Sequence, residues 1–393
     1  MILNIHPAIV ALEKEMVSYR RHFHQYPELG YKEYDTGRYI LSVLEDLNLP
    51  VQYPLAETGI AATMANGDGP VIALRADMDA LPIQETTDIP YKSRNEGVMH
   101  ACGHDGHMAI LLGTLLALHR HRDLWRGTVK FLFQPAEEGG AGALRMLGEG
   151  ALRDPAPASI FSLHLWNYQP IGTIGIQAGP VLAAADLFTI TVQGKGGHAA
   201  APQGAVDAVV VASQLVTVIQ SIVSRNVNPL ESAVVTLGSI HGGDNFNVIA
   251  DKVVLEGTAR AYEENVRQLV RDRLEDACRG MAGASGAVID LDYRDGYPPT
   301  VNDDAMTTIA HQAARKVVAE GAREPYLSMG SEDMSYFLQE IPGCLFFVGS
   351  AREGDPAGSV PQHCSHYDID ERALTVGASV FMEIVMLQLP VVS

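Results

Sequence analysis

The order of helical and strand-like segments is the feature that most constrains the fold of this chain. In its first part, apolar residues recur at helical spacing over 8–26 and 36–47, and short continuous apolar runs occur at 71–74, 129–133 and 159–163. Short apolar strands that alternate with helices are typical of a mostly parallel sheet covered by helices on both faces. The sequence therefore predicts an α/β fold for this part of the chain.

A different order of segments begins near residue 186. It predicts strands at 187–193, 233–240, 252–261 and 287–293 and helices at 205–224 and 265–281. The order βαββαβ is that of a ferredoxin-like sandwich, which we expect to be an inserted second domain. The later segments, helix 303–319, strand 343–348 and helix 371–387, then return to the first sheet. We expect one domain at 1–183 and 298–393 and the inserted domain at 184–297.

Composition and charge exclude several classes of protein. A chain of 393 residues, 47% of them hydrophobic, suits two domains. With 47 acidic and 28 basic side chains, its formal net charge of -19 argues against nucleic-acid or membrane partners. We find neither an apolar run of ~18 residues or more nor a signal-peptide pattern. Four scattered cysteines do not make a disulfide framework. We expect a soluble cytoplasmic protein with reduced thiols.

Polar side chains follow the apolar runs at several points. In open α/β sheets, ligands bind beyond the carboxyl ends of the strands, so these side chains are candidates for a site. They are Asp77 and Asp79 in "VIALRADMD", Cys102 and His104 in "HACGHDGHM", Glu137 and Glu138 in "VKFLFQPAEE", His164 in "SIFSLHLW", and His363 and His366 in "QHCSHYDID". Cysteine, histidine and carboxylates supplied by separate strand ends indicate a metal site.

The cluster "HACGHDGHM" at 100–108 allows other interpretations: a buried small residue, a redox thiol, a cysteine nucleophile or a helix cap. The spacing of Cys102 and His104 lets both side chains point the same way, as ligands must, and no third group orients His104 as a base. No Cys-x-x-Cys motif supports redox chemistry. Asp105 is predicted to be the N-cap of the next helix. The adjacent Glu137 and Glu138 can divide metal binding and general base catalysis.

Nearly the whole chain resembles a known family, the metal-dependent aminoacylases that include hippurate hydrolases, plant auxin-conjugate amidohydrolases and N-acetyl-diaminopimelate deacetylases. The resemblance rests on "RRHFHQYPELGYKEYDT", "LRADMDALPIQE", "MHACGHDGHMA", "FQPAEEGGAGA", "GKGGHAAAPQGAVDAV", "NVIADKVVLEGTARAY" and "MGSEDMSYF". The closing "HCSHYDID" lacks the proline of the family's corresponding segment. His363 falls on the family's ligand position there, whereas His366 falls on a variable one.

The resemblance implies a role for each matching residue. It implies five metal ligands: Cys102, His104, Glu138, His164 and His363. It also implies Glu137 as the general base and Asp77 as an aspartate that orients a ligand. In the inserted domain, it implies that His198 stabilises the oxyanion and that Asn247 and Arg260 hold a substrate carboxylate. The family fold is a catalytic α/β domain with a smaller inserted lid or dimerisation domain.

The activity implied by the resemblance is hydrolysis of the amide bond of N-acyl or N-aroyl amino acids, which are small-molecule substrates. It implies two divalent ions per subunit, with zinc favoured and manganese, cobalt or nickel as alternatives, and a homodimer or homotetramer formed through the inserted domain. A dipeptidase, a carboxypeptidase or an N-acetyl-diaminopimelate deacetylase would use the same chemistry. A silent metal-binding homologue is disfavoured, because all five ligands and the base are present.

Overall fold

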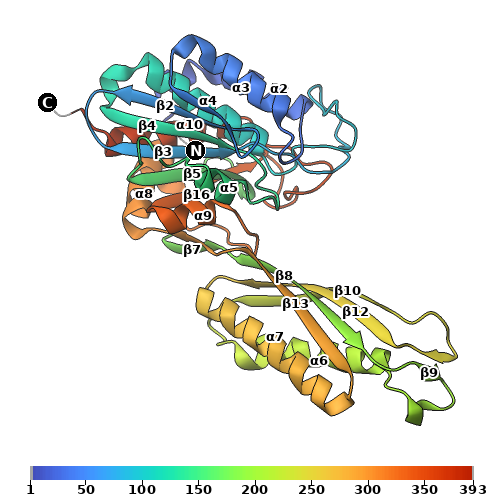
Figure 1. The fold of residues 1–393 in the computed structure, drawn as a ribbon. Helices are drawn as coiled ribbons and strands as arrows, with labels where there is room; N and C mark the ends of the chain where they lie inside the picture. Colours follow the sequence, from blue (N-terminus) through green and yellow to red (C-terminus); the bar gives the residue numbers. More distant parts are fainter. Residues whose placement is uncertain (1–2, 392–393) are drawn as a thin grey trace. The chain divides into compact units, whose positions relative to one another are not determined.

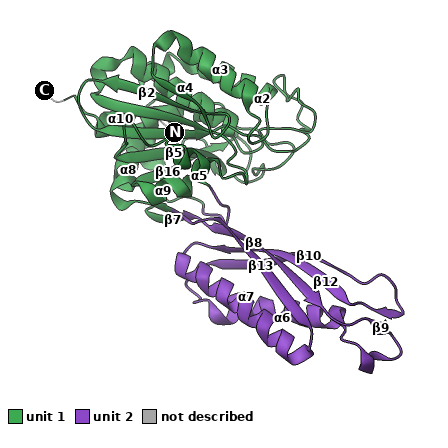
Figure 2. Ribbon diagram, viewed as in Figure 1, with its two compact units in different colours: residues 1–179, 301–326, 333–393 green, residues 180–300, 327–332 purple. Residues whose placement is uncertain are grey.

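The computed structural model describes residues 3–391, so the first two and last two residues of the predicted first domain lie outside the described residues. The chain divides into two compact units (Figure 2). Unit 2 comprises Pro180–Thr300 and Leu327–Glu332, and unit 1 comprises the remainder of the chain. The segment Leu327–Glu332 was expected in the first domain. Strands β7 (Gly179–Leu182) and β14 (Thr300–Asn302) lie where the chain passes between the units.

Unit 1 contains an eight-stranded sheet in the order β1-β2-β4-β3-β5-β16-β6-β15. Its strands are β1 (Val51–Leu55), β2 (Gly59–Asn66), β3 (Val71–Asp77), β4 (Gly127–Gln134), β5 (Ser159–Pro170), β6 (Ile174–Gly175), β15 (Ala322–Arg323) and β16 (Gly343–Ala351). Strands β4, β3, β5 and β16 are parallel, which confirms the predicted mostly parallel sheet. The register pairs Asp77 with Gln134 and Arg75 with Ser162, so Asp77 and His164 reach the same edge of the sheet.

Helices cover both faces of this sheet (Figure 1). One face packs against α2 (Glu13–Gln25), α3 (Tyr34–Leu44), α4 (His104–Arg120), α8 (Asp304–Val318) and α10 (Arg372–Gln388), and the other against α5 (Gly142–Gly148) and α9 (Met334–Glu340). The predicted helix at 8–26 is divided into α1 (Pro7–Val10) and α2. Helix α4 is buried from His104 to Leu118 because it packs against β3, α2 and α10.

Unit 2 has the predicted βαββαβ order. Its elements are β8 (Ala184–Gln193), α6 (Ala208–Asn226), β10 (Ala233–Gly242), β12 (Lys252–Ala261), α7 (Glu264–Ser285) and β13 (Val288–Tyr297). The antiparallel sheet has the order β10-β12-β8-β13, and both helices pack against one face of it. A second, two-stranded sheet joins β9 (Gly197–His198) to β11 (Val248–Ile249).

Helix α6 is the one helix among residues 3–391 that is long and apolar enough, by length and composition, to cross a membrane. One side of α6, with Val211, Leu215 and Ile219, lies in the hydrophobic core of unit 2. Amphipathic packing of this kind is typical of a helix on the surface of a globular unit.

Candidate metal centre

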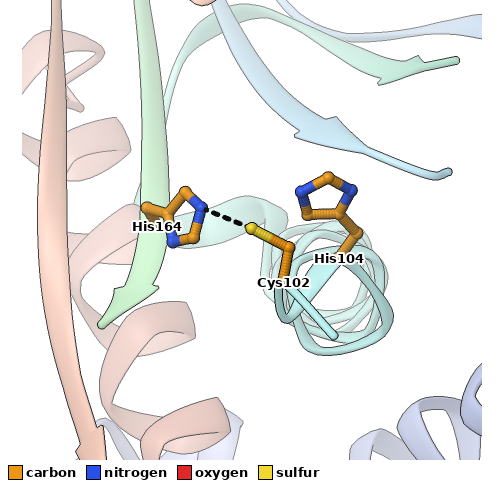
Figure 3. Close-up of side chains that lie close together, drawn as sticks. All are labelled: Cys102, His104 and His164. Carbon is orange, nitrogen blue, oxygen red and sulfur yellow. Dashed lines mark hydrogen bonds between the residues drawn. The ribbon is translucent and has the colours of Figure 1, made fainter. Parts of the chain in front are cut away.

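The predicted ligands form overlapping groups at the sheet edge of unit 1. The ligand atoms of Cys102, His104 and His164 all lie within 4.8 Å of one another, and all three residues are buried (Figure 3). The Cys102 Sγ atom is 3.5 Å from His164 Nε2. Cys102 also groups with Glu138 and His363, whereas His366 belongs to none of these groups. The structure thus brings all five predicted ligands into one connected set of donor atoms.

Glu137 lies beside these donors. Its carboxylate groups with His104 and Glu138, again with the ligand atoms within 4.8 Å of one another. The His363 Nε2 atom is 3.2 Å from Glu138 Oε1, and the backbone N–H of His363 donates to the Ala101 carbonyl at 2.7 Å. This bond ties the loop of His363 to the residue that precedes Cys102. The two carboxylates to which the sequence assigned metal binding and general base catalysis therefore lie side by side.

A sharp turn places Cys102 and His104 on the same side of the chain. Gly103 between them has a φ of +94°, and a Cβ atom there would lie 2.9 Å from the Tyr367 hydroxyl. The conformation and the close approach both favour glycine. Gly103 occupies the N-cap position of α4, and His104 is its first residue.

The prediction that Asp105 caps α4 is wrong. Asp105 lies in the first turn of the helix, fully buried, and its carboxylate accepts a hydrogen bond from Arg20 Nε at 2.8 Å. His24 Nδ1 is also 2.8 Å from the carboxylate. Although burial raises the pKa of Asp105, the Arg20 guanidinium and His24 lower it more, so the carboxyl group stays ionised. The Asp105 side chain, which was expected to bond to the amides at the start of α4, therefore bonds to Arg20, a buried residue of α2.

The imidazole rings are oriented for coordination. His104 donates from Nδ1 to the Asp79 carbonyl at 2.8 Å, and its buried Nε2 has no hydrogen-bond partner within residues 3–391. Burial lowers the pKa of His104, but the Asp77 and Asp79 carboxylates raise it by more, so that the resulting pKa is about 10. His164 donates from Nδ1 to the Leu165 carbonyl at 2.7 Å, which leaves Nε2 facing Cys102. The negative charge that stabilises a proton on His104 would stabilise a metal ion in its place, and His164 Nε2 offers a free lone pair beside Cys102.

The thiol of Cys102 fits a metal site for an electrostatic reason. Burial and the nearby carboxylates of Glu138, Glu137 and Asp77 all raise its pKa well above the ordinary value. A thiolate is therefore unstable at this position unless a cation compensates its charge. Thiolate, imidazole and carboxylate are the donors that divalent zinc takes in proteins. The residues present fit a divalent metal.

The turn after β4 is held by the side chain of Asp79. One carboxylate oxygen accepts from the Glu137 N–H and the other from the Glu138 N–H, both at 2.9 Å. This aspartate therefore fixes the backbone of the predicted base and of a predicted ligand, and its carbonyl accepts from the His104 ring. From the sequence, Asp79 was a candidate at a strand end without an assigned role. A carboxylate following a buried strand was the one available signal.

Asp77 makes its closest histidine contact with His107. It accepts from His107 Nδ1 at 2.6 Å and from Arg75 Nη1 at 2.7 Å, whereas His104 Nε2 is 3.8 Å away. The Leu165 N–H donates to His107 Nε2 at 2.9 Å, which fixes the neutral Nδ1–H tautomer of that ring. Asp77 thus connects through His107 to β5 next to His164. Asp77 was expected to orient a ligand, and in the structure its partner is His107, which is not one of the predicted ligands.

The three predicted substrate contacts all belong to unit 2. His198 is exposed in β9, and its Nδ1 accepts from the Ala200 N–H at 3.0 Å, so Nε2 carries the proton of the neutral ring. Asn247 lies next to it, because its carbonyl accepts from the Ala199 N–H at 3.1 Å. Arg260 is half-buried in β12, and within residues 3–391 no carboxylate lies within ion-pair distance of its guanidinium. Its guanidinium donates instead to the Thr258 hydroxyl at 3.3 Å and to the Met329 carbonyl at 3.4 Å.

An α/β unit with thiolate, imidazole and carboxylate donors at its strand ends, and a glutamate beside them, defines a metal-dependent hydrolase. Peptidase family M20/M25/M40 matches residues 73–387 of the chain. The chain belongs to this family, and it is an enzyme of the amidohydrolase and peptidase type.

Relatives with assigned names agree with this class. The N-acetyl-L-cysteine deacetylase of Bacillus subtilis (strain 168) is 41% identical over 372 residues, which cover 94% of this chain and 87% of that protein. The IAA-amino acid hydrolase ILR1-like 2 of Arabidopsis thaliana is 41% identical over 368 residues, with coverages of 93% and 83%. A crystal structure of the Bacillus subtilis YXEP protein, described as a dinuclear metal binding peptidase, has a TM-score of 0.84 at 33% identity and covers 98% of this chain and 100% of that one.

Proposed function

We propose that the enzyme hydrolyses the amide bond of N-acyl or N-aroyl amino acids to a carboxylic acid and a free amino acid. The observation that carries this proposal is the position of Glu137, a buried carboxylate grouped with the donors His104 and Glu138. A base beside metal ligands suits hydrolysis of an unactivated amide. The names of the deacetylase and the IAA-amino acid hydrolase support acylated amino acids as the substrate class.

The residues that would hold the metal are Cys102, His104, Glu138, His164 and His363. Cys102 belongs to two donor groups, one with His104 and His164 and one with Glu138 and His363, which supports two ions per subunit. A thiolate ligand favours zinc, and the carboxylate and imidazole ligands also suit manganese, cobalt or nickel. When bound, such an ion polarises a carbonyl group and lowers the pKa of water.

Glu137 moves the proton in this proposal. Its carboxylate takes a proton from the attacking water and then delivers it to the amine nitrogen as the carbon–nitrogen bond breaks. The Asp79 carboxylate holds the Glu137 amide, so the base is presented on a fixed backbone. A fixed position suits a group that must reach the water first and the leaving nitrogen afterwards.

Unit 2 would supply the remaining contacts. We propose that the Nε2–H of His198 donates to the oxyanion that develops on the substrate carbonyl, and that Arg260 and Asn247 bind the substrate's free carboxylate. Burial disfavours the charged form of Arg260 and so lowers its pKa, and no carboxylate pairs with it within the described residues. A bound substrate carboxylate would supply the missing negative charge, which supports this role. A positioned oxyanion donor contributes ~3 to 4 kcal/mol to transition-state stabilisation.

We propose that unit 2 also forms a homodimer or a homotetramer and that the enzyme acts in the cytoplasm. Strand β10 is an edge of the unit 2 sheet and exposes Val234 and Ile240. Helix α6 exposes Val209, Val210 and Val218. An open apolar strand edge is a template for pairing with another chain. Light scattering on the purified protein tests the oligomeric state, and a monomer at micromolar concentration would refute this part.

A substrate panel tests the proposed activity. Metal-free enzyme is refilled with zinc, manganese or cobalt and mixed with N-acetyl-amino acids, N-benzoyl-amino acids and free dipeptides, and the products are measured by mass spectrometry. Faster turnover of the N-acyl compounds than of dipeptides, lost on chelation, is the expected result. Preference for dipeptides would instead indicate a dipeptidase or carboxypeptidase, and no turnover by any metal form would refute the proposal.

A further inference from the structure

The segment Leu29–Glu33 packs against the turn that carries Glu137 and Glu138, and the proposed function gives it no role. The Tyr31 hydroxyl donates to the Gly140 carbonyl at 2.6 Å, and the Glu33 carboxylate accepts from the Ala136 N–H at 2.9 Å. Leu29 forms a bridge with Ala80, the residue after Asp79. The segment therefore contacts the turn itself and also Ala80, the neighbour of the aspartate that holds the turn.

Ala136 has an unusual backbone conformation. Its φ is +52°, in the left-handed region that residues with a side chain rarely adopt, and it directly precedes Glu137. The site is also tightly packed, because a Cβ atom on Gly140 would lie 2.7 Å from the Ala136 Cβ and one on Gly30 would lie 3.1 Å from it. A return of Ala136 to the common right-handed or extended region would redirect the chain at the base.

Glu33 is placed to hold this conformation. It occupies the N-cap position of α3, yet its side chain bonds to no amide of that helix. Glu28 takes that part, because its carboxylate accepts from the Asp35 and Thr36 amides. The Glu33 carboxylate is directed to the turn instead: one oxygen accepts from Ala136 and the other from the Thr58 hydroxyl at 2.6 Å.

Fold stability does not account for this carboxylate. Glu33 is fully buried, and within residues 3–391 no lysine, arginine or histidine lies within ion-pair distance of it. Burial raises the pKa of its carboxyl group to about 7, with a smaller contribution from Asp79 in the same direction. An unpaired buried carboxylate costs stability, so a role in the site explains the residue better than packing does.

We propose that Glu33 is a positioning residue for the reaction: its hydrogen bond to the Ala136 amide holds the left-handed conformation that aims Glu137 at the substrate. The role rests on the proposed function, in which Glu137 is the base. Glu33 and Asp79 together hold three successive amides, those of Ala136, Glu137 and Glu138. Because the Glu33 side chain bonds to the Ala136 amide and to Thr58, it reaches the base through the backbone.

The test is a double-mutant cycle between Glu33→Ala and Ala136→Gly, with Glu33→Gln and Thr58→Val as comparison variants. Glycine adopts the left-handed conformation without cost, so it should replace part of what Glu33 supplies. The glutamine introduced by Glu33→Gln keeps an oxygen that can accept from the Ala136 amide. Thr58→Val removes the other partner of Glu33 and leaves the bond to Ala136, so it controls for a general loss of stability. We measure kcat, KM, bound zinc and the urea midpoint of each variant.

We expect Glu33→Ala to lower kcat by ~10- to 100-fold, with KM and zinc content nearly unchanged, because a small misplacement of a reacting group has effects of this size. Glu33→Gln should stay within about fivefold of the wild type, and Thr58→Val within about threefold. In the Ala136→Gly background, the loss caused by Glu33→Ala should be at least about threefold smaller. Equal losses in both backgrounds, or a loss in Thr58→Val as large as in Glu33→Ala, would overturn the proposal.

A crystal structure of the Glu33→Ala variant gives a readout that does not depend on turnover. We expect Ala136 to leave the left-handed region and the Glu137 carboxylate to move, whereas an unchanged φ at Ala136 would overturn the proposal. If the wild-type enzyme hydrolyses no N-acyl amino acid, the proposed function fails, and the crystal structure still decides whether Glu33 holds the turn.

Discussion

The stability of the enzyme should depend on the ionisation of Glu33, and Glu33→Gln isolates that dependence. The carboxyl group has an ordinary pKa of 4.5, and burial raises it to about 7 in the folded chain. The folded state therefore binds this proton more tightly than the unfolded state does. Wild-type stability should fall as the pH rises from the unfolded pKa to the folded pKa, and it should change little for this reason above pH ~8. A glutamine at this position does not titrate and resembles the protonated form.

The magnitude follows from the same pKa values. The difference between an unfolded pKa of 4.5 and a folded pKa of about 7 lowers the free energy of unfolding by roughly 3 kcal/mol in total. About 2.5 kcal/mol of this decrease falls between pH 5 and pH 8. The free energy of unfolding of Glu33→Gln, minus that of the wild type, should rise by this amount across the interval. Titrations of other groups are common to both proteins and cancel in the difference.

Urea unfolding of the metal-free proteins measures this difference. Both tryptophans of the chain, Trp125 and Trp166, belong to unit 1, so their fluorescence reports on the unit that contains Glu33. Unfolding curves at pH 5, 6, 7 and 8 give the free energies by linear extrapolation. A constant difference between the two proteins from pH 5 to pH 8 would refute the reasoning, because it would mean that Glu33 has the same pKa in both states.

Four further outcomes are expected. Glu137→Gln should retain its bound metal and lose ~100- to 10,000-fold in kcat, as measured by metal analysis and turnover. Cys102→Ser should lose bound metal and activity together in the same two assays. His107→Ala should weaken zinc affinity ~10- to 100-fold in a chelator competition, because the ring connects Asp77 to the strand of His164. Asp105→Asn should lower the free energy of unfolding by ~3 kcal/mol, because Arg20 loses a buried partner.

The sequence predicted the parallel strands of unit 1 and the βαββαβ order of the main sheet and helices of unit 2, because each of these segments is continuously apolar or strongly periodic; it did not predict the short strands β9 and β11. It missed β1 and β2. Strand β1 has four exposed residues in five and contains Pro54, and β2 is rich in alanine and glycine, so neither shows the pattern of a buried strand. The short helices α5 and α9 were missed because seven residues give too few turns for a helical period.

The donor atoms of the site could be predicted, but the groups that hold them could not. Cysteine, histidine and glutamate at strand ends are visible in the sequence as motifs. The bond between Arg20 and Asp105 joins residues 85 apart, and the bond between Glu33 and Ala136 joins residues 103 apart. Neither pair has a local pattern, since the partners meet only after the sheet has formed. The wrong cap assignment for Asp105 has this origin.

The turn at 136–138 shows how carboxylates can hold the backbone of Glu137, the proposed base. A cation bonded to the side chain of a carboxylate base would also fix the position of that base. The cation would, however, stabilise the ionised carboxylate, which lowers its pKa and makes the carboxylate a weaker proton acceptor. Asp79 and Glu33 instead bind the backbone amides of the turn, and a negative charge near a base does not lower its pKa. The conformation is thus fixed through main-chain donors. The cost is a buried carboxylate at Glu33 that has no ion-pair partner within residues 3–391. Holding the proposed base in position therefore lowers the free energy of unfolding of unit 1, and this loss grows as the pH rises toward the folded pKa of Glu33.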